Sequence, residues 1–310
     1  MRKQISKYTN LALKGFAMGA ANVIPGVSGG TIALITGIFE RLINSIKSFD
    51  VTAAKLLLAG RIKDFLKYID FYFLAAVFFG VLASVVSIAK LLEYLFLHYP
   101  VYVWAFFFGL ILASIYFVGK SVQKWNLSVI IAFLIGTAAA LYISMLNPAT
   151  ENDSFFYLII CGVVAICSMI LPGLSGSFIL ILMGNYKLVM VSVNNLDVEI
   201  LLPVIIGAVG GAVAFSHILS WIYKKYQDQT ISILTGFILG SLGILWPWQK
   251  EVFLKDELGN FILKDGQEIV QTTDTYIPES FSTEVIIAVA LMIIGIITIS
   301  LIEKIANKQN

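Results

Sequence analysis

Charged residues are scarce in this chain of 310 residues, and long polar stretches are scarcer still. Only 13% of the residues are Asp, Glu, Lys or Arg, whereas 59% are hydrophobic and the mean hydropathy is +0.90. A chain so poor in charge cannot cover a large soluble domain with a polar surface. The composition therefore predicts a polytopic membrane protein.

Cysteine and histidine are also rare. Cys161 and Cys167 lie six positions apart in one apolar segment, where a helix turns them to different sides, so we expect neither a disulfide nor a metal site. His98 and His217 are the only histidines, and no arginine lies in the predicted membrane core. A membrane lipid phosphatase needs a nucleophilic histidine, a second histidine or an aspartate, and an arginine clamp. The chain is therefore predicted not to be an enzyme, and we expect no cofactor and no nucleic-acid partner.

Long apolar runs are what the chain does contain. Six of them approach or exceed the roughly 18 to 20 residues that cross a bilayer as a helix. They cover about residues 71–97, 101–118, 128–146, 199–223, 230–248 and 284–302. These runs predict an all-α polytopic membrane protein.

Two motifs interrupt the apolar sequence with residues that oppose helix formation. They read "IPGVSGGTIALITGIFE" from Ile24 and "LPGLSGSFILILMGNYK" from Leu171, and their prolines are 147 positions apart. Two further matches follow: "FFGLILAS" with "LTGFILGS" at a spacing of 127, and "SVIIA" with "EVIIA" at 156. The same order of elements recurs, so we predict two repeats, residues 1–150 and 151–310.

Each repeat is predicted to contain a broken helical element followed by three transmembrane helices. We expect the broken elements, about residues 10–46 and 155–192, to be re-entrant hairpins; two fully spanning arms are the alternative. By either arrangement a repeat crosses the membrane an odd number of times, so the second repeat is inverted relative to the first. Inverted repeats with broken helices are typical of secondary transporters.

The basic residues predict the orientation. Only Lys250, Lys255 and Lys264 fall in the predicted extracellular loop at about residues 249–283, whereas most Lys and Arg fall in segments that are cytoplasmic if the N-terminus is. This positive-inside pattern predicts cytoplasmic N- and C-termini. Residues 49–69 predict an interfacial helix on the inner leaflet, with a solvated linker as the alternative. The alternation in residues 250–280 suggests a β-hairpin.

The broken elements are the candidate binding site. Irregular backbone survives in hydrocarbon only where it is buried in protein or lines a wet cavity. The helix-breaking Pro25 and Pro172 precede new helices, whose first N–H groups lack intrahelical partners and attract anions. We expect a phosphate or carboxylate to be bound by Asn22, Gly26, Ser28, Gly29, Gly30, Thr31, Gly173, Ser175, Gly176 and Ser177. The alternative is that the glycines only let helices pack closely.

Four ionisable residues are candidates for charge compensation or proton coupling. Lys14 either balances a phosphate or extends its ammonium group to the surface. Glu40 either carries a coupling proton or marks a helix end, and Lys187 takes the equivalent position in the second motif. His217 either relays protons or packs against its neighbours.

The stretches "GAANVIPGVSGGTIALITGIFERLI" and "LPGLSGSFILILMGNY" resemble the bacterial polyprenyl-phosphate transporter family (PopT-like, formerly a domain of unknown function), and the resemblance covers essentially the whole chain. The resemblance implies a lipid flippase of the bacterial plasma membrane. Such a protein returns undecaprenyl phosphate from the outer to the inner leaflet, which recycles the carrier for peptidoglycan and other cell wall biogenesis. Its lipid partner keeps the prenyl tail in the bilayer, so the protein supplies only a polar path for the phosphate.

The residues alone leave an alternative open, a secondary transporter of a small soluble organic or phosphate anion that uses the same site. They also leave open the transport direction and the coupling ion, for which protons are one candidate. The oligomeric state is open as well, and a homodimer is one arrangement considered.

Overall fold

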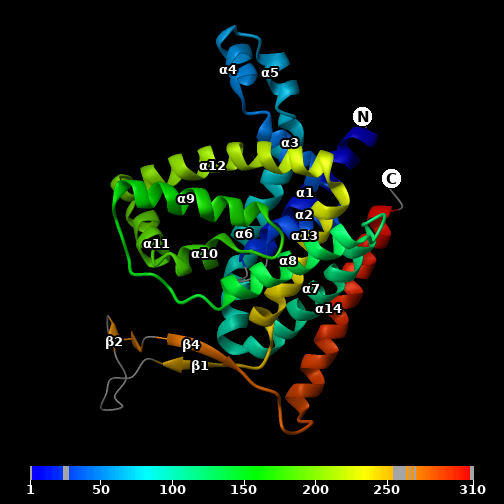
Figure 1. The fold of residues 1–310 in the computed structure, drawn as a ribbon, viewed down its shortest axis with the longest axis vertical. Helices are drawn as coiled ribbons and strands as arrows, with labels where there is room; N and C mark the ends of the chain where they lie inside the picture. Colours follow the sequence, from blue (N-terminus) through cyan, green and yellow to red (C-terminus); the bar gives the residue numbers. More distant parts are fainter. Residues whose placement is uncertain (1, 24–27, 254–262, 265–266, 269, 308–310) are drawn as a thin grey trace.

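The computed structural model describes residues 2–23, 28–253, 263–264, 267–268 and 270–307 (Figure 1). Pro25 and Gly26, two of the predicted motif residues, lie outside the described residues. Most of the described chain is helical. The helices are α1 (Arg2–Val23), α2 (Gly29–Ile35), α3 (Phe39–Lys47), α4 (Val51–Leu58), α5 (Ile62–Tyr68), α6 (Phe71–His98), α7 (Pro100–Lys120), α8 (Leu127–Ser144), α9 (Phe155–Ile170), α10 (Gly176–Leu182), α11 (Tyr186–Asn195), α12 (Val198–Lys225), α13 (Gln227–Ser241), the 3-10 helix η1 (Leu242–Leu245) and α14 (Thr283–Asn307).

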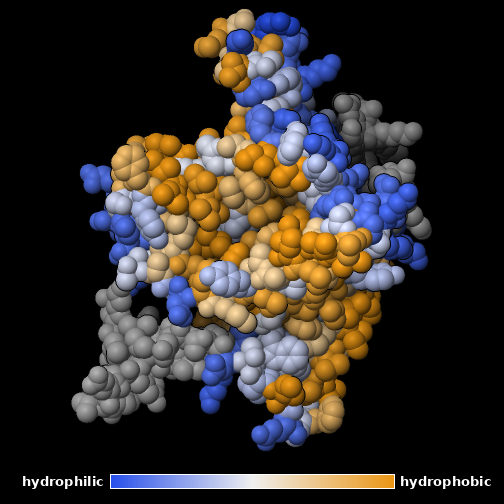
Figure 2. Space-filling view, viewed as in Figure 1, coloured by the Kyte–Doolittle hydropathy of each residue, from blue (hydrophilic) through white to orange (hydrophobic). Residues whose placement is uncertain are grey.

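Six of the described helices are long and apolar enough to cross a membrane: α6, α7, α8, α12, α13 continued by η1, and α14. They coincide with the six apolar runs of the sequence. Hydrophobic residues cover most of the face shown in Figure 2, while hydrophilic and hydrophobic residues are mixed over α4 and α5, and hydrophilic residues gather at the right of the view. The prediction of an all-α polytopic membrane protein is thereby confirmed, and the chain is a multi-pass membrane protein.

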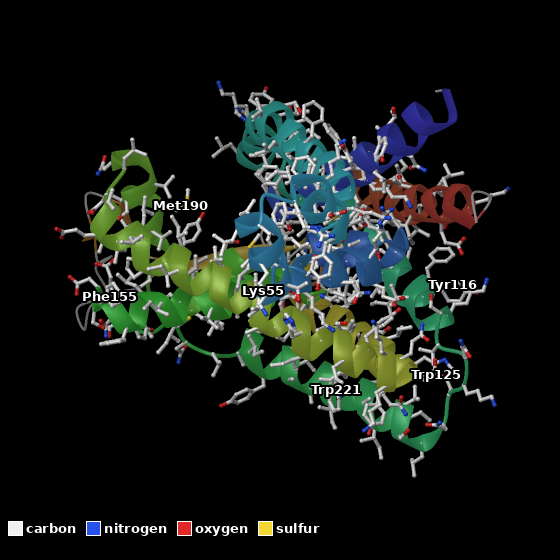
Figure 3. The ribbon with its side chains drawn as sticks, turned by 90° about the horizontal axis from the view of Figure 1, so that it is seen from above. Lys55, Tyr116, Trp125, Phe155, Met190 and Trp221 are labelled. Carbon is white, nitrogen blue, oxygen red and sulfur yellow. The ribbon has the colours of Figure 1, made fainter. Side chains whose placement is uncertain are left out.

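Exposed aromatic side chains lie toward opposite ends of the molecule. Seen from above in Figure 3, Phe155 lies at one end, and Tyr116, Trp125 and Trp221 lie toward the other. The ammonium group of Lys225 lies 5.2 Å from the ring centre of Trp221. Aromatic rings of this kind, with a basic neighbour, are typical of the two membrane–water interfaces.

Each broken element contains a second break that the helix–break–helix prediction did not include. The first break lies at the motif, and the second follows the short helix, at Gly37 after α2 and at Gly184 after α10. Both glycines have a positive φ, of 70° and 76°, which side chains with a Cβ disfavour. The α10 and α11 segments are bent by 119° at this point. In each element a longer first helix, of 22 residues in α1 and 16 in α9, is therefore followed by two short helices instead of one longer second arm.

Four helix pairs approach closely at glycines: α1 with α6, α9 with α12, α8 with α13, and α7 with α14. A Cβ at Gly15 or Gly80 would collide with the facing backbone of α6 or α1, and Gly162 and Gly207 are equally constrained between α9 and α12. Gly15 and Gly162 are 147 positions apart, and Gly80 and Gly207 are 127 apart. The helix contacts thus repeat at the spacings of the sequence motifs.

The segment 49–69 forms two short helices rather than one. Gly60, with φ of 68°, turns the chain between α4 and α5, and the pair projects from the body at the top of Figure 1. At the lower left of the same view, β1 (Gln249–Phe253) pairs antiparallel with β4 (Val270–Thr275), and β2 (Leu263–Lys264) with β3 (Gln267–Glu268). The predicted β-hairpin is therefore present.

Candidate anion-binding site

In the first motif, nearby side chains accept hydrogen bonds from the first N–H groups of α2. Ser28 is the N-cap of α2, where its Oγ accepts a hydrogen bond from the Gly30 N–H at 3.1 Å. Oδ1 of Asn22 accepts from the Gly29 N–H at 2.7 Å. A cap of this kind satisfies N–H groups that would otherwise lack a partner. In the structure the Asn22 side chain therefore binds the backbone at the start of α2.

The second motif is bonded differently. Ser175 precedes α10, but its side chain caps no N–H of that helix and instead lies 2.7 Å from Oγ of Ser177. Gly173 has φ of 85°, and a Cβ there would lie 2.7 Å from the carbonyl group of Phe237 in α13. Pro172 is buried in the turn just before it. The glycine is therefore required both for the turn and for the approach of α13.

The two motifs contact each other directly. Ser28 is only 1% exposed. Its Oγ lies 3.2 Å from the carbonyl oxygen of Met169 and 3.1 Å from that of Leu171. The Gly173 N–H donates to Oγ1 of Thr31 at 3.1 Å. Segments more than 140 positions apart in the sequence thus meet through hydroxyl groups and backbone.

A cavity of about 280 Å3 lies beside this contact. Its polar lining residues are Asn22, at the end of α1 just before the first motif, Ser175 and Ser177 of the second motif, and Tyr186. The others are Gly176 and apolar residues, with Met169, Leu180 and Met190 among them. Both α2 and α10 have only seven residues, so their dipoles add little and the side-chain hydroxyl and amide groups are the main donors. The cavity can hold a polar headgroup against donors while apolar side chains contact a hydrocarbon tail.

The four ionisable candidates do not line this cavity. Nζ of Lys14 donates to the Thr36 carbonyl at 2.7 Å, at the opposite end of α2 from Ser28. Lys187 is exposed on α11, and Nδ1 of His217 lies 2.9 Å from the Val213 carbonyl oxygen in its own helix. Glu40 is exposed and lines a different cavity.

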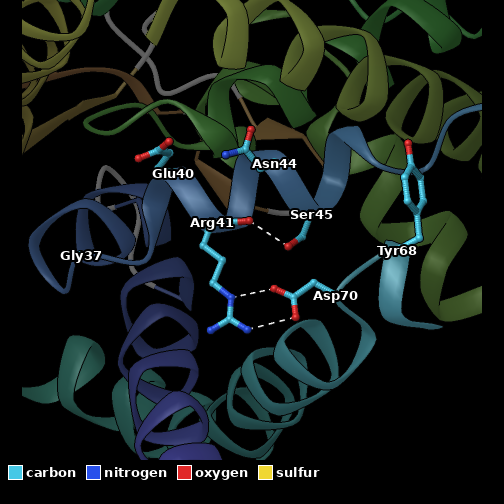
Figure 4. Close-up of a pocket in the computed structure, with 7 residues that line it drawn as sticks. All are labelled: Gly37, Glu40, Arg41, Asn44, Ser45, Tyr68 and Asp70. Atoms are coloured by element: carbon cyan, nitrogen blue, oxygen red, sulfur yellow. Dashed lines mark hydrogen bonds and ion pairs between the residues drawn. The ribbon is translucent and has the colours of Figure 1, made fainter. Parts of the chain in front are cut away.

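That second cavity, of about 430 Å3, contains an ion pair that the sequence analysis missed. Arg41 donates through Nε to Asp70 at 2.6 Å and through Nη2 at 3.0 Å, as Figure 4 shows. The remaining lining residues are Gly37, Glu40, Asn44, Ser45 and Tyr68. The only hint of this ion pair in the sequence was Arg41 itself, which is one of three arginines in the chain and directly follows Glu40. Its partner is 29 positions away, beyond α4 and α5, and no local pattern reveals such a pair.

The described residues contain no group of three His, Cys, Asp or Glu side chains that could hold a metal ion.

Comparison with known proteins identifies a family. The VCA0040-like family, described as undecaprenyl phosphate translocase-like, matches residues 18–261. A polyprenyl-phosphate transporter of Vibrio cholerae is 37% identical over 314 residues, which cover 99% of this chain and 100% of the relative. A polyprenyl-phosphate transporter of Staphylococcus aureus is 30% identical over 259 residues, 78% of this chain and 87% of the relative. No solved structure matches the chain.

Proposed function

Because the chain belongs to the undecaprenyl phosphate translocase-like family, we propose that it transports polyprenyl phosphate across a membrane. The more specific proposal is a flippase that moves undecaprenyl phosphate from the outer to the inner leaflet of a bacterial plasma membrane. This step returns the lipid carrier to cell-wall synthesis. The protein acts as a transporter and not as an enzyme.

The headgroup binds in the 280 Å3 cavity between the two motifs. The observation that carries this assignment is that Asn22, Ser175 and Ser177 line the same cavity, most of whose other lining residues are apolar. Amide and hydroxyl donors hydrogen-bond phosphate oxygens, while the methionine and leucine side chains leave the prenyl tail in apolar surroundings. The glycines keep the backbone free of side chains at this position.

The two repeats are related by inversion, and each places a broken element at the site. The recurrent glycine contacts of α1 with α6 and of α9 with α12 support this relation. The hydrogen bonds of Ser28 and Thr31 to residues 169–173 join the two broken elements. Passage of a headgroup between the motifs requires these few bonds to separate, which is the movement expected when one repeat rocks against the other.

The orientation follows from the positive-inside rule, with both termini cytoplasmic. In Figures 1 and 3 the ends of α1 and α14 lie on the same side of the molecule, away from β1 and β4, which supports it. A proton taken up by the phosphate itself, with a second pKa near ~6, would couple transport to the proton gradient.

A vesicle assay with a fluorescent polyprenyl phosphate tests the proposal. The Ser28→Ala, Ser175→Ala double variant is expected to lower the transport rate by about tenfold or more, because Ser175 lines the cavity and Ser28 bonds the two motifs to each other. The matched control is Ser87→Ala, since Ser87 is exposed on α6 and bonds the carbonyl group of Ala83 in its own helix. A normal rate for the folded double variant would contradict the assignment. Uptake of a soluble anion without lipid movement would favour the alternative transporter.

A further inference from the structure

We propose that the 430 Å3 cavity at Arg41 is a second phosphate-binding site for the lipid headgroup. It lies at the opposite end of α2 from the 280 Å3 cavity lined by Asn22, Ser175 and Ser177, which we call the motif cavity. Asp70 holds the guanidinium group when no headgroup is bound. This inference rests on the proposed transport of polyprenyl phosphate, and it assigns a place where the headgroup rests after it has left the motifs.

The position of the cavity relative to α2 is the first argument. The motif cavity includes Asn22, which bonds the Gly29 N–H at the start of α2, whereas the second cavity includes Gly37, just after the helix ends. Seven helical residues separate the two ends by about 10 Å. The two cavities therefore lie near opposite ends of the same short helix.

The chemistry of Arg41 is the second argument. Its guanidinium group lies 4.2 Å from the ring centre of the fully buried Phe73, which fixes the plane of the group. The same group already binds an anion, the Asp70 carboxylate, through two of its nitrogens. This fork geometry suits phosphate equally well, and a phosphate with more charge and three oxygens competes well with a carboxylate.

The ion pair is exposed enough to exchange. The side chains of Arg41 and Asp70 are 40% and 37% exposed, so water and solutes reach both partners of the pair. Figure 4 shows the Asp70 carboxylate facing the guanidinium group of Arg41. An arriving phosphate can therefore displace Asp70 without unfolding its surroundings.

The other charges around the cavity leave room for an anion. Figure 4 shows the Glu40 carboxylate on the opposite side of α3 from the guanidinium group. A second cation lies close by, since Lys14 bonds the carbonyl of Thr36, the neighbour of Gly37 in the cavity wall. Asn44 also lines the cavity, but Figure 4 shows its side chain on the side of α3 that carries Glu40, and its Oδ1 accepts from Ser220 of α12 at 2.8 Å.

Binding of farnesyl phosphate to the purified full-length protein in detergent tests the site. Asp70→Asn removes the competing carboxylate charge and is expected to tighten binding by about threefold or more. Arg41→Lys keeps the charge but loses the fork, and is expected to weaken binding about tenfold. A damaged fold cannot produce the tightening. In the Arg41→Gln background the effect of Asp70→Asn should vanish, which assigns it to this cavity rather than to the motifs.

The matched control is Arg61→Lys, because Arg61 forms an exposed pair with Asp64 at 2.8 Å on the projecting helices. The Arg61→Lys variant should bind farnesyl phosphate with the affinity of the unchanged protein. Unchanged or weaker binding by Asp70→Asn, or full affinity of Arg41→Lys, would overturn the site. Farnesol should bind neither the unchanged protein nor the variants, because it lacks the phosphate.

Inorganic phosphate distinguishes the source of the ligand. Affinity for inorganic phosphate well below that for farnesyl phosphate supports a lipid headgroup site, and equal affinities overturn the lipid assignment in favour of free phosphate. If the Arg41 variants bind normally while the double serine variant still fails to transport, the second site is wrong and the proposed function stands.

Discussion

Ser28 and Ser175 occupy the same position in the two motifs but make different hydrogen bonds. Ser28 caps its own helix and contacts two carbonyl groups of the other motif, so its hydroxyl is fully used within the protein. Ser175 bonds only the neighbouring Ser177 hydroxyl in the described structure, and both line the cavity. The second motif is therefore the more accessible part of the proposed headgroup site, and the first motif is the more rigid part.

Gly173 provides a prediction at this scale. Gly173→Ala is expected to destabilise the protein by about 1–3 kcal/mol, because the positive φ is strained with a Cβ and the added atom meets the backbone of Phe237. Thermal unfolding in detergent measures the loss. Gly210→Ala is the control, since a Cβ at Gly210 points into open space. Equal stability of the two variants would show that the approach of α13 to the turn is not tight.

At the scale of elements, the sequence predicted the six spanning helices well because each is a long uninterrupted apolar run. It also placed both motifs in breaks, since proline and glycine oppose helix formation locally. The second break at Gly37 and Gly184 was missed, although these glycines align at the repeat spacing, because a single glycine within a helical pattern is a weak signal. The Arg41–Asp70 pair depends on tertiary contact and has no local sequence pattern.

The sequence predicted one helix where the structure has α4 and α5. The Asp50 carboxylate, just before α4, hydrogen-bonds to both helices. Oδ1 of Asp50 accepts from the N–H groups of Thr52 and Ala53, and Oδ2 accepts from the Tyr68 hydroxyl at 2.8 Å. These bonds, the one from Ala53 foremost, hold the pKa of Asp50 below its ordinary value, and the bond to Asp50 raises the pKa of Tyr68. The carboxylate therefore caps α4 and links the two helices.

This cap predicts a local pH dependence. A carboxyl group with a lowered pKa in the folded state stabilises the fold above its unfolded pKa near ~4, and the contribution is lost as the pH falls through the folded value. Asp50→Ala should speed hydrogen exchange in α4 by roughly fivefold at neutral pH, as for a cap worth about 1 kcal/mol. Exchange in α8, whose cap is Asn126, should not change. Equal exchange in α4 of both proteins would contradict the role of Asp50.

At the scale of the whole molecule, the orientation predicts which faces water-soluble reagents reach. In a background that carries Cys161→Ala and Cys167→Ala, Leu58→Cys on α4 should react with an impermeant thiol reagent only from the cytoplasmic side. Ile277→Cys, after β4, should react only from the other side. Both positions are exposed, at 87% and 79%, so access through the protein does not limit the reaction. Labelling of both from one side would contradict the proposed orientation.

The central claim is that the two motifs form one headgroup site, and photocrosslinking from the cavity wall measures it most directly. Leu180, which lines the motif cavity, is replaced by p-benzoylphenylalanine, and exposed Leu141 on α8 is replaced in the control protein. We expect Leu180→p-benzoylphenylalanine to crosslink radiolabelled undecaprenyl phosphate, and excess unlabelled undecaprenyl phosphate, but not undecaprenol, to suppress the product. Equal crosslinking from both positions, or equal suppression by the uncharged alcohol, would contradict the account.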